Sequence, residues 1–312
     1  MDSHIYSEKM LNNLKMNLLD DNMHRYITYP KFVFLCGKAF DKDEYNDTNR
    51  GIVDRYISAK TDNLFIVLSE KLWENSFGTN IDLLTFEEFL AEVSDAIVLF
   101  VESPGSFCEL GAFAYADKLF SDKLIIVIDK KYESDESFII TGPTAKAKKD
   151  GAKVIYAPLD GTGLLSCASM RNTIDRIITD FTSKSAGINK RSPNNDENAV
   201  YVNIFIIELL ELIRLLEPVS RKDLLDIYKA IKNFQNFKFI KKDGNDFHNE
   251  IKYDYIIKLL ETVQIINISG DIITSNGFKK VQPLMLNYSK KSHNKERNRL
   301  LCRKYRYGGF TK

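Results

Sequence analysis

The N-terminal part of the chain alternates short, almost continuously apolar runs with amphipathic segments, and this alternation limits the fold more than any other feature. Apolar runs of this kind are typical of strands buried on both faces, and helical periodicity between them indicates βαβ units around a parallel sheet. The class is therefore α/β. The expected strands are Phe32–Cys36, Asn63–Leu68, Ala96–Val101, Lys123–Ile128 and Lys153–Tyr156, and the expected helices are Thr48–Lys60, Thr85–Ser94, Phe107–Leu119 and Met170–Phe181.

A polar segment with Gly and Pro, residues 183–198, has little to bury and is interpreted as a linker. It separates an α/β domain, residues 1–182, from a second domain, residues 199–312, as expected for a chain of 312 residues. The second domain has three helical patterns followed by a short hairpin, which predicts a mainly α, winged-helix-like fold with a basic C-terminal tail. These segments are Val200–Leu216, Lys222–Phe234, Tyr253–Val263, Ile265–Ser269 and Ile272–Thr274.

Charge is distributed unevenly between the two domains. Residues 198–312 contain 21 Lys and Arg against 12 Asp and Glu, whereas the rest of the chain contains 23 against 31. A basic domain suits nucleic acid, although a basic surface packed on a protein partner fits equally well. The candidate contacts are Lys241, Lys242, Lys279, Lys280, Lys290, Lys291, Arg303, Lys304 and Arg306.

Cysteine and apolar content argue against several classes of protein. The four cysteines form no Cys-x-x-Cys pair, which speaks against a disulfide framework and a zinc site, and we expect no bound metal. Residues 1–19 lack the apolar core of a signal peptide, and the most apolar stretch, Ile204–Leu216, is interrupted by charges. We therefore expect a cytoplasmic protein without a membrane span.

The window from Val98 to Asp117 contains the strongest candidate for chemistry. A buried strand runs through a Pro-Gly turn into a helix, and ligands of open parallel sheets bind at such carboxyl ends. Glu109 could there stabilise or trap the oxocarbenium-like charge that develops when a glycosidic bond breaks. The loop before it offers further substrate contacts, which are Glu102, Ser103, Gly105 and Ser106.

Glu109 also has a purely structural interpretation. Ser106-Phe-Cys-Glu109 fits a capping box, and Thr85-Phe-Glu-Glu88 fits the same pattern before another helix. Cys108, without a histidine nearby in the motif, is interpreted as a buried apolar residue rather than a nucleophile.

The loop after the first strand is the second candidate for ligand contact. Gly37 would let the backbone approach a ligand, Lys38 would reach a phosphate, and Phe40 would line the site. The spacing of a P-loop is absent. Trp73, the one tryptophan, would either cover the pocket as a lid or simply pack.

The segment Ser-Pro-Gly-Ser-Phe-Cys-Glu-Leu-Gly-Ala-Phe, residues 103–113, resembles the catalytic motif of nucleoside deoxyribosyltransferase-like proteins. The resemblance implies a Rossmann-like parallel sheet and a role for Glu109 as nucleophile at the sugar C1′. An acid usually precedes the Gly-Ser/Thr pair of that family, where this chain has Glu102 and Ser103.

The α/β domain, linker and second domain together resemble the effector proteins of bacterial retrons. This resemblance implies antiphage defence by NAD-cleaving toxicity, held in check by a reverse transcriptase and its multicopy single-stranded DNA in a higher-order complex. The expected reaction is hydrolysis of the nicotinamide–ribose bond, with NAD as a nucleotide substrate and no cofactor. The alternatives are a nucleotide-sensing DNA-binding regulator without catalysis and a deoxyribosyltransferase acting on other nucleosides.

The charge of the C-terminal tail generates a first prediction. Neutralising Lys290, Lys291, Arg303, Lys304 and Arg306 should weaken association with a nucleic-acid-containing partner and flatten its salt dependence, because each lost phosphate contact reduces counterion release. A salt titration of binding measures both effects. Unchanged affinity with an unchanged salt slope would contradict the prediction.

Overall fold

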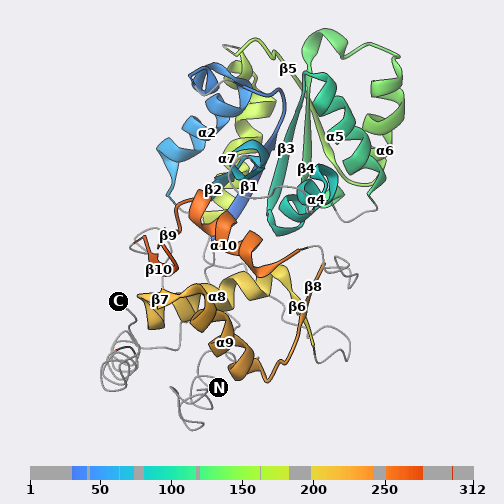
Figure 1. Ribbon diagram of the computed structural model, residues 1–312. Helices are drawn as coiled ribbons and strands as arrows, with labels where there is room; N and C mark the ends of the chain where they lie inside the picture. Colours follow the sequence, from blue (N-terminus) through green and yellow to red (C-terminus); the bar gives the residue numbers. More distant parts are fainter. Residues whose placement is uncertain are drawn as a thin grey trace. The chain divides into compact units, whose positions relative to one another are not determined.

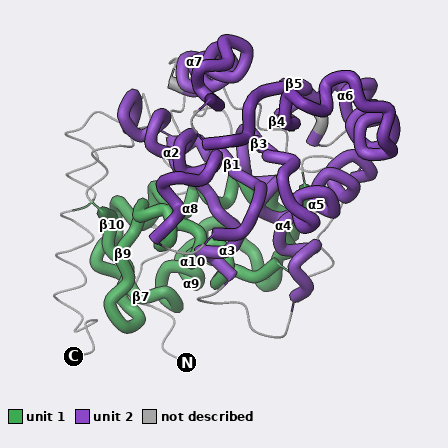
Figure 2. The backbone as a smooth tube through the Cα atoms, turned by 90° about the horizontal axis from the view of Figure 1, so that it is seen from above, with its two compact units in different colours: residues 1–29, 184–312 green, residues 30–183 purple. Residues whose placement is uncertain are grey.

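The computed structural model describes residues 30–40, 43–62, 64–73, 81–116, 120–161, 163–182, 198–241 and 251–276, together with Arg297. The chain divides into two compact units, and Figure 2 colours them separately. The first unit spans residues 30–183, and the described residues from 198 onward belong to the second. The proposed linker lies almost entirely outside the described residues.

The first unit is built on a five-stranded parallel sheet with the order β2-β1-β3-β4-β5 (Figure 1). Its strands are β1 Lys31–Cys36, β2 Leu64–Val67, β3 Ala96–Val101, β4 Leu124–Asp129 and β5 Lys153–Ala157. All six residues of β1 and all six of β3 are buried. The α/β class and the five strands predicted from the apolar runs are thus confirmed, with ends displaced by a residue or so.

Helices cover both faces of this sheet. They are α2 Asn49–Lys60, α3 Ser69–Trp73, α4 Leu83–Val93, α5 Pro104–Tyr115, α6 Ala145–Lys149 and α7 Ala168–Thr182. Shorter turns are η1 Tyr45–Asp47, η2 Ser121–Lys123, η3 Lys130–Tyr132, η4 Ile140–Thr144 and η5 Leu164–Ser166. Alternate β1 residues, Val33 and Leu35, pack in one cluster with side chains of α2 and α7. Phe34, between them, meets Phe113 of α5 at a ring distance of 6.5 Å on the opposite face.

Helices α4 and α5 begin before the positions predicted for them, and both shifts have the same cause, an N-cap residue earlier in the chain. In α4 the side chain of Asp82, at the N-cap, accepts a hydrogen bond from the Thr85 backbone N–H at 2.9 Å. In α5 the N-cap is Ser103, and Pro104 fills the first helical position, where its missing N–H costs nothing. Neither Thr85 nor Ser106 is therefore an N-cap.

Helix α3 was not anticipated, because five residues carry too little periodicity to be recognised. Its last residue, Trp73, packs on Phe86 of α4 with a ring distance of 5.6 Å. Of the two interpretations of Trp73, the structure shows packing.

The second unit combines helices α8 Val202–Leu216, α9 Arg221–Lys232 and α10 Tyr253–Thr262 with short strands. Strands β7 Val219–Ser220, β10 Ile272–Ser275 and β9 Ile266–Ser269 form an antiparallel sheet, and β6 Ala199–Tyr201 pairs in parallel with β8 Lys238–Ile240. The hairpin predicted around Gly270 is present, with a φ of +62° at that glycine. The winged-helix description remains a prediction.

Helix α8 is a core helix, as its sequence indicated. Its Glu208 is 1% exposed and is compensated by Lys232 at 2.7 Å and by the Tyr228 hydroxyl at 2.8 Å. Within the described ranges, every helix is too short or too polar to cross a membrane.

Candidate active site

The strand order of the sheet has a switch point between β1 and β3. From β1 the chain continues to β2 on one side, and β3 lies on the other, so the loops after β1 and β3 diverge at the carboxyl ends of these strands. Ligands of doubly wound sheets bind at such a switch point. The two loops singled out from the sequence, after Cys36 and after Val101, both lie there.

The turn from β3 into α5 is fixed by the hydroxyl of Ser106. Its oxygen accepts hydrogen bonds from the backbone N–H groups of Glu102 and Ser103, both at 2.9 Å, and it donates to the Ser103 carbonyl. Ser103 caps the helix by accepting from the Ser106 N–H at 3.3 Å. Ser106 is 0% exposed, so its hydroxyl shapes the loop, and substrate contact by it stays a prediction.

Glu109 therefore lies in the second turn of α5. The capping-box interpretation of Glu109 is wrong, because the box in this helix is formed by Ser103 and Ser106. The interpretation of Cys108 as buried is also wrong, since its thiol lies on the exposed side of α5. Gly105, in the first turn, is exposed, and a Cβ atom there would lie 3.9 Å from Ser103 Oγ, an ordinary van der Waals distance, so ligand contact at Gly105 stays a prediction.

The environment of Glu109 disfavours its charge. Burial, and secondarily the nearby Glu87, raise the pKa of its carboxyl to about 8, while Arg50 acts in the opposite direction. Its Oε2 atom is buried and has no hydrogen-bond partner among the described residues. Such an uncompensated carboxyl costs folding free energy and is characteristic of functional sites.

Glu87 is a second perturbed carboxyl at this edge. It comes from α4, is 8% exposed, and has a pKa raised to about 7 by burial and by the charge of Glu70. Burial, and secondarily the charges of Glu109 and Glu87, hold the pKa of the Cys36 thiol at the end of β1 well above its usual range. Side chains from β1, α3, α4 and α5 thus influence one another's pKa values.

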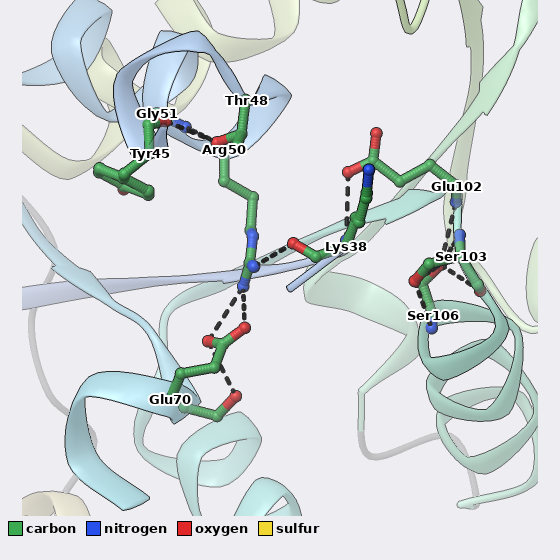
Figure 3. Close-up of polar contacts among 10 residues, drawn as sticks. Lys38, Tyr45, Thr48, Arg50, Gly51, Glu70, Glu102, Ser103 and Ser106 are labelled. Atoms are coloured by element: carbon green, nitrogen blue, oxygen red, sulfur yellow. Dashed lines mark hydrogen bonds and ion pairs between the residues drawn. The ribbon is translucent and has the colours of Figure 1, made fainter. Parts of the chain in front are cut away.

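Arg50, from the first turn of α2, is the cation of this cluster. Figure 3 shows its guanidinium between Glu70 and the backbone of Lys38. One Nη atom lies 2.8 Å from a Glu70 carboxylate oxygen, and the other donates to the Lys38 carbonyl. The guanidinium also lies over the Phe40 ring, 4.8 Å from its centroid. Arg50 is 1% exposed and holds the loop after β1 in place.

Glu102 joins the β1 and β3 loops. One carboxylate oxygen accepts from the Lys38 backbone N–H at 3.2 Å, and the other accepts from Asn49 Nδ2 at 2.6 Å (Figure 3 shows the first contact). Asn49 Nδ2 also contacts the Leu159 carbonyl at 3.3 Å. Both oxygens of Glu102 are thus engaged by the protein, and contact of Glu102 with a sugar hydroxyl stays a prediction.

The structure brings together most of the residues predicted for the first unit. Gly37 and Lys38 meet Glu102, the Lys38 side chain is exposed, and Phe40 is half-buried beside Arg50, with the Tyr45 ring 4.6 Å away. Sequence reasoning missed Asn49, Arg50, Glu70 and Glu87. Asn49 and Arg50 are the first residues of α2, which follows the loop after β1, and this position could have identified them as candidate site residues. Glu87 gave no such signal, because it lies in the middle of the amphipathic helix α4.

Within the described part of the chain, no group of three or more His, Cys, Asp or Glu side chains is arranged to hold a metal ion.

The predicted contacts of the second unit lie mostly outside the described residues. Lys241 is half-buried, whereas Lys242, Lys279, Lys280, Lys290, Lys291, Arg303, Lys304 and Arg306 fall outside those ranges. The third helix of this unit, α10, contains Asp254 and Glu261 against one basic residue, Lys258, which pairs with Glu261 at 2.8 Å. Its charge is therefore unsuited to phosphates.

Gly37 offers a test of the contact between the two loops. Its φ is +158°, and a Cβ atom there would lie 3.0 Å from Glu102 Oε1 and 3.2 Å from Phe100 Cβ. Gly37→Ala should displace the Glu102 carboxylate and lower the free energy of unfolding by about 1–3 kcal/mol, measured by denaturant titration. Gly111→Ala, at a helical site with open space, is the control and should be neutral or stabilising. Equal free energies of unfolding for the wild type and Gly37→Ala would refute the close approach of Gly37 to Glu102.

Comparison with known proteins identifies relatives. Residues 46–268 match the family described as STM3845 retron effector protein. "Retron Ec86 putative ribosyltransferase/DNA-binding protein" from Escherichia coli is 37% identical over 153 residues, covering 48% of this chain and 49% of the relative. "Retron Ec73 putative ribosyltransferase/DNA-binding protein" from Escherichia coli is 29% identical over 217 residues, covering 61% and 66% respectively. Because this match covers well over half of the chain and includes the candidate site residues from Asn49 to Glu109, the chain belongs to the STM3845 retron effector protein family.

Proposed function

We propose that the first unit hydrolyses an N-glycosidic bond, the nicotinamide–ribose bond of NAD, with Glu109 as nucleophile or as stabiliser of the oxocarbenium-like transition state. The observation that carries the proposal is the position of Glu109. Its carboxyl lies on the helix that follows β3, at the switch point of the sheet, with a buried oxygen that no described residue satisfies. The name ribosyltransferase given to the two relatives supports the same class of chemistry.

Nicotinamide requires little acid catalysis to leave. In NAD it is bonded through a positively charged nitrogen and departs as a neutral molecule, so the main requirement is a carboxylate facing the positive charge that grows on the ribose. At ~4 Å and an effective dielectric constant near 20, this attraction amounts to ~4 kcal/mol, or about three powers of ten in rate. Water then attacks C1′, directly or after a glycosyl-Glu109 intermediate, giving ADP-ribose, nicotinamide and a proton.

Only ionised Glu109 can perform either role. Its pKa of about 8 leaves most molecules protonated at pH 7. A cation beside the carboxyl favours the ionised form. A substrate with a positively charged ring therefore assists the ionisation that its own cleavage requires.

We further propose that the second unit connects this activity to a retron reverse transcriptase and its multicopy single-stranded DNA. The order α8, β7, α9, α10, β9 and β10 supports a winged-helix-like fold. The acidic balance of α10 makes the basic tail the better candidate for phosphate contact.

Glu109→Gln tests the catalytic assignment. The substitution keeps the size of the side chain and removes its charge, so NAD turnover should fall by at least ~100-fold while ligand binding is largely retained. The measurement is timed chromatography of NAD and nucleosides incubated with each variant, in the absence of any retron partner that could inhibit the enzyme. Cleavage of nucleosides but not NAD would favour the deoxyribosyltransferase alternative. Comparable NAD turnover by the wild type and Glu109→Gln would contradict the catalytic role of Glu109.

Thermal melts of the same two proteins are the control for folding. Because the pKa of Glu109 is raised in the folded state, the wild type loses stability as the pH rises from about 4.5 to about 8. Glu109→Gln should therefore melt at the same temperature or higher, with the advantage largest above pH 8. Glu136→Gln, at an exposed site, should leave both activity and melting unchanged.

The raised pKa of Glu109 also predicts a pH dependence. The value of kcat/KM reports ionisations of the free enzyme, and the active form is the carboxylate. We expect kcat/KM for NAD to increase as the pH is raised, to level off near pH 8, and to fall about tenfold per pH unit on the acid side. Initial rates between pH 5.5 and pH 9.5 measure the profile, and a plateau that already begins at pH 5 would contradict it.

A further inference from the structure

The side-chain amide of Asn49 connects loops at the carboxyl edge of the sheet. Asn49 is the first residue of α2 and is 4% exposed. Its Nδ2 atom donates to Glu102 Oε2, after β3, at 2.6 Å and to the Leu159 carbonyl, after β5, at 3.3 Å. The other Glu102 oxygen accepts from the Lys38 N–H, after β1, at 3.2 Å (Figure 3). One carboxylate is thus held between the loops that follow β1, β3 and β5.

Close backbone packing holds the loop after β5 against the start of α2. Gly161 in this loop has a φ of +78°, and a Cβ atom there would lie 3.0 Å from the Asp47 carbonyl oxygen. Leu159 packs on the apolar cluster that includes Val53 of α2. The amide of Asn49 therefore lies between two acceptors whose positions are fixed.

The orientation of the Asn49 amide follows from these two neighbours. A carboxylate oxygen and a backbone carbonyl can only accept hydrogen bonds, so the amide nitrogen must face them and Oδ1 must point elsewhere. Oδ1 is buried and accepts no hydrogen bond from a described residue. Leaving this acceptor unsatisfied costs folding free energy. What the arrangement achieves is a fixed position for the carboxylate of Glu102.

The carboxylate of Glu102 can still accept further hydrogen bonds. Each of its oxygens has two acceptor positions, and the protein fills one on each. Among the described residues both donors are neutral, and Glu102 forms no ion pair. Its side chain is only half-buried, so a ligand can reach it. A negatively charged acceptor repels phosphate and suits a ligand with two adjacent donors, as in a vicinal diol.

Glu102 and Glu109 lie on either side of the turn that begins α5. The Glu102 N–H donates to Ser106 Oγ at 2.9 Å, and Glu109 follows Ser106 by one helical turn (Figure 3 shows the hydrogen bond). Helical side chains lean toward the N-terminus of their helix, which directs Glu109 back toward this turn. From Ser103 to Glu109 the axis rises by about 9 Å, which matches the span of one sugar ring with a contact on each side.

We propose that Asn49 is a positioning residue that holds Glu102 as the acceptor for the 2′- and 3′-hydroxyls of ribose, and that the site thereby selects ribosides over deoxyribosides. This role rests on the proposed function and adds the determinant of sugar specificity to it. Asn49 acts through Glu102 and does not touch the substrate. Because the acceptor is charged, each bond to a hydroxyl is strong, and the loss of one hydroxyl weakens binding markedly. The selectivity is opposite to that of the deoxyribosyltransferase alternative.

The test compares NAD with two analogues that lack either the 2′- or the 3′-hydroxyl of the nicotinamide-bearing ribose. Dissociation constants are measured by calorimetry in the Glu109→Gln background, so that cleavage does not interfere. Asn49→Asp keeps the size of the side chain, removes the donor and places a second carboxylate beside Glu102. Asn46→Asp, at an exposed position in the turn before α2, adds the same charge and is the matched control.

The Glu109→Gln protein should bind NAD roughly 10- to 100-fold more tightly than either analogue. Adding Asn49→Asp should abolish most of this preference through weaker NAD binding, whereas Asn46→Asp should leave the preference unchanged. A general loss of structure would weaken all three ligands alike, so the ratio of affinities separates positioning from folding. Equal affinities in the Glu109→Gln protein, tighter binding of the 2′-deoxy analogue, or a preference that survives Asn49→Asp would each overturn the inference.

Failure of this inference is distinguishable from failure of the proposed function. If Glu109→Gln abolishes NAD cleavage but the three ligands bind equally, only the determinant of sugar specificity is lost. If Glu109→Gln cleaves NAD as fast as the wild type, the proposed function is lost, and the role of Asn49 with it. Should Asn49→Asp not fold, Gly37→Ala replaces it, because a Cβ atom there would lie 3.0 Å from Glu102 Oε1 and displace the carboxylate. An unchanged preference in that variant overturns the inference.

Discussion

The buried guanidinium of Arg50 is the contact on which the candidate site depends. A cation removed from water is tolerated only when it is paired and hydrogen-bonded, and Arg50 meets this requirement through Glu70, the Lys38 carbonyl and the face of Phe40. In doing so it joins α2, α3 and the loop after β1. The adjacent Asn49 reaches Glu102 and the Leu159 carbonyl, so one helical turn positions loops after four strands.

The same pairing explains why Glu109 is difficult to ionise. Because Glu70 takes up the charge of Arg50, little of it remains to compensate Glu87 and Glu109, and burial raises the pKa of both carboxyls. Each uncompensated buried group lowers the stability of the fold, and a sequence selected for stability alone would replace it with an amide or an apolar residue. A carboxyl kept at this cost suits chemistry in which the substrate supplies the missing positive charge.

The sequence predicted the parts of this arrangement that depend on local patterns. Five apolar runs predicted the five strands of the sheet, because a strand buried on both faces can hardly contain a polar residue. The loops after Cys36 and Val101 followed from the rule that ligands bind at carboxyl ends of parallel strands. The start of α5 was placed too late, because two serines three residues apart, Ser103 and Ser106, could each be the N-cap.

The charge cluster could not be predicted in the same way. Whether Glu87 is solvated or buried depends on which side of α4 faces the sheet, and residues distant in the sequence decide that. Helical periodicity treats a glutamate as a polar position, so it assigns Glu87 to the solvent face. The position of Arg50 at the start of a helix was a usable signal, but its partners were not predictable, since Lys38 lies 12 residues before it and Glu70 lies 20 residues after it.

The second unit illustrates how local charge can correct an inference drawn from fold alone. The winged-helix-like fold predicted for this unit would bring its third helix to DNA, yet α10 carries more acid than base, and Lys258 is already paired with Glu261. Affinity for a phosphate backbone increases with the number of cations that reach it. Residues 288–307 contain eight Lys and Arg and one Glu, interleaved with tyrosines that suit stacking on unpaired bases. For the nucleic-acid contact that we propose for the tail, this composition favours single-stranded or irregular nucleic acid over the major groove of a duplex, because stacking requires bases that are not already paired.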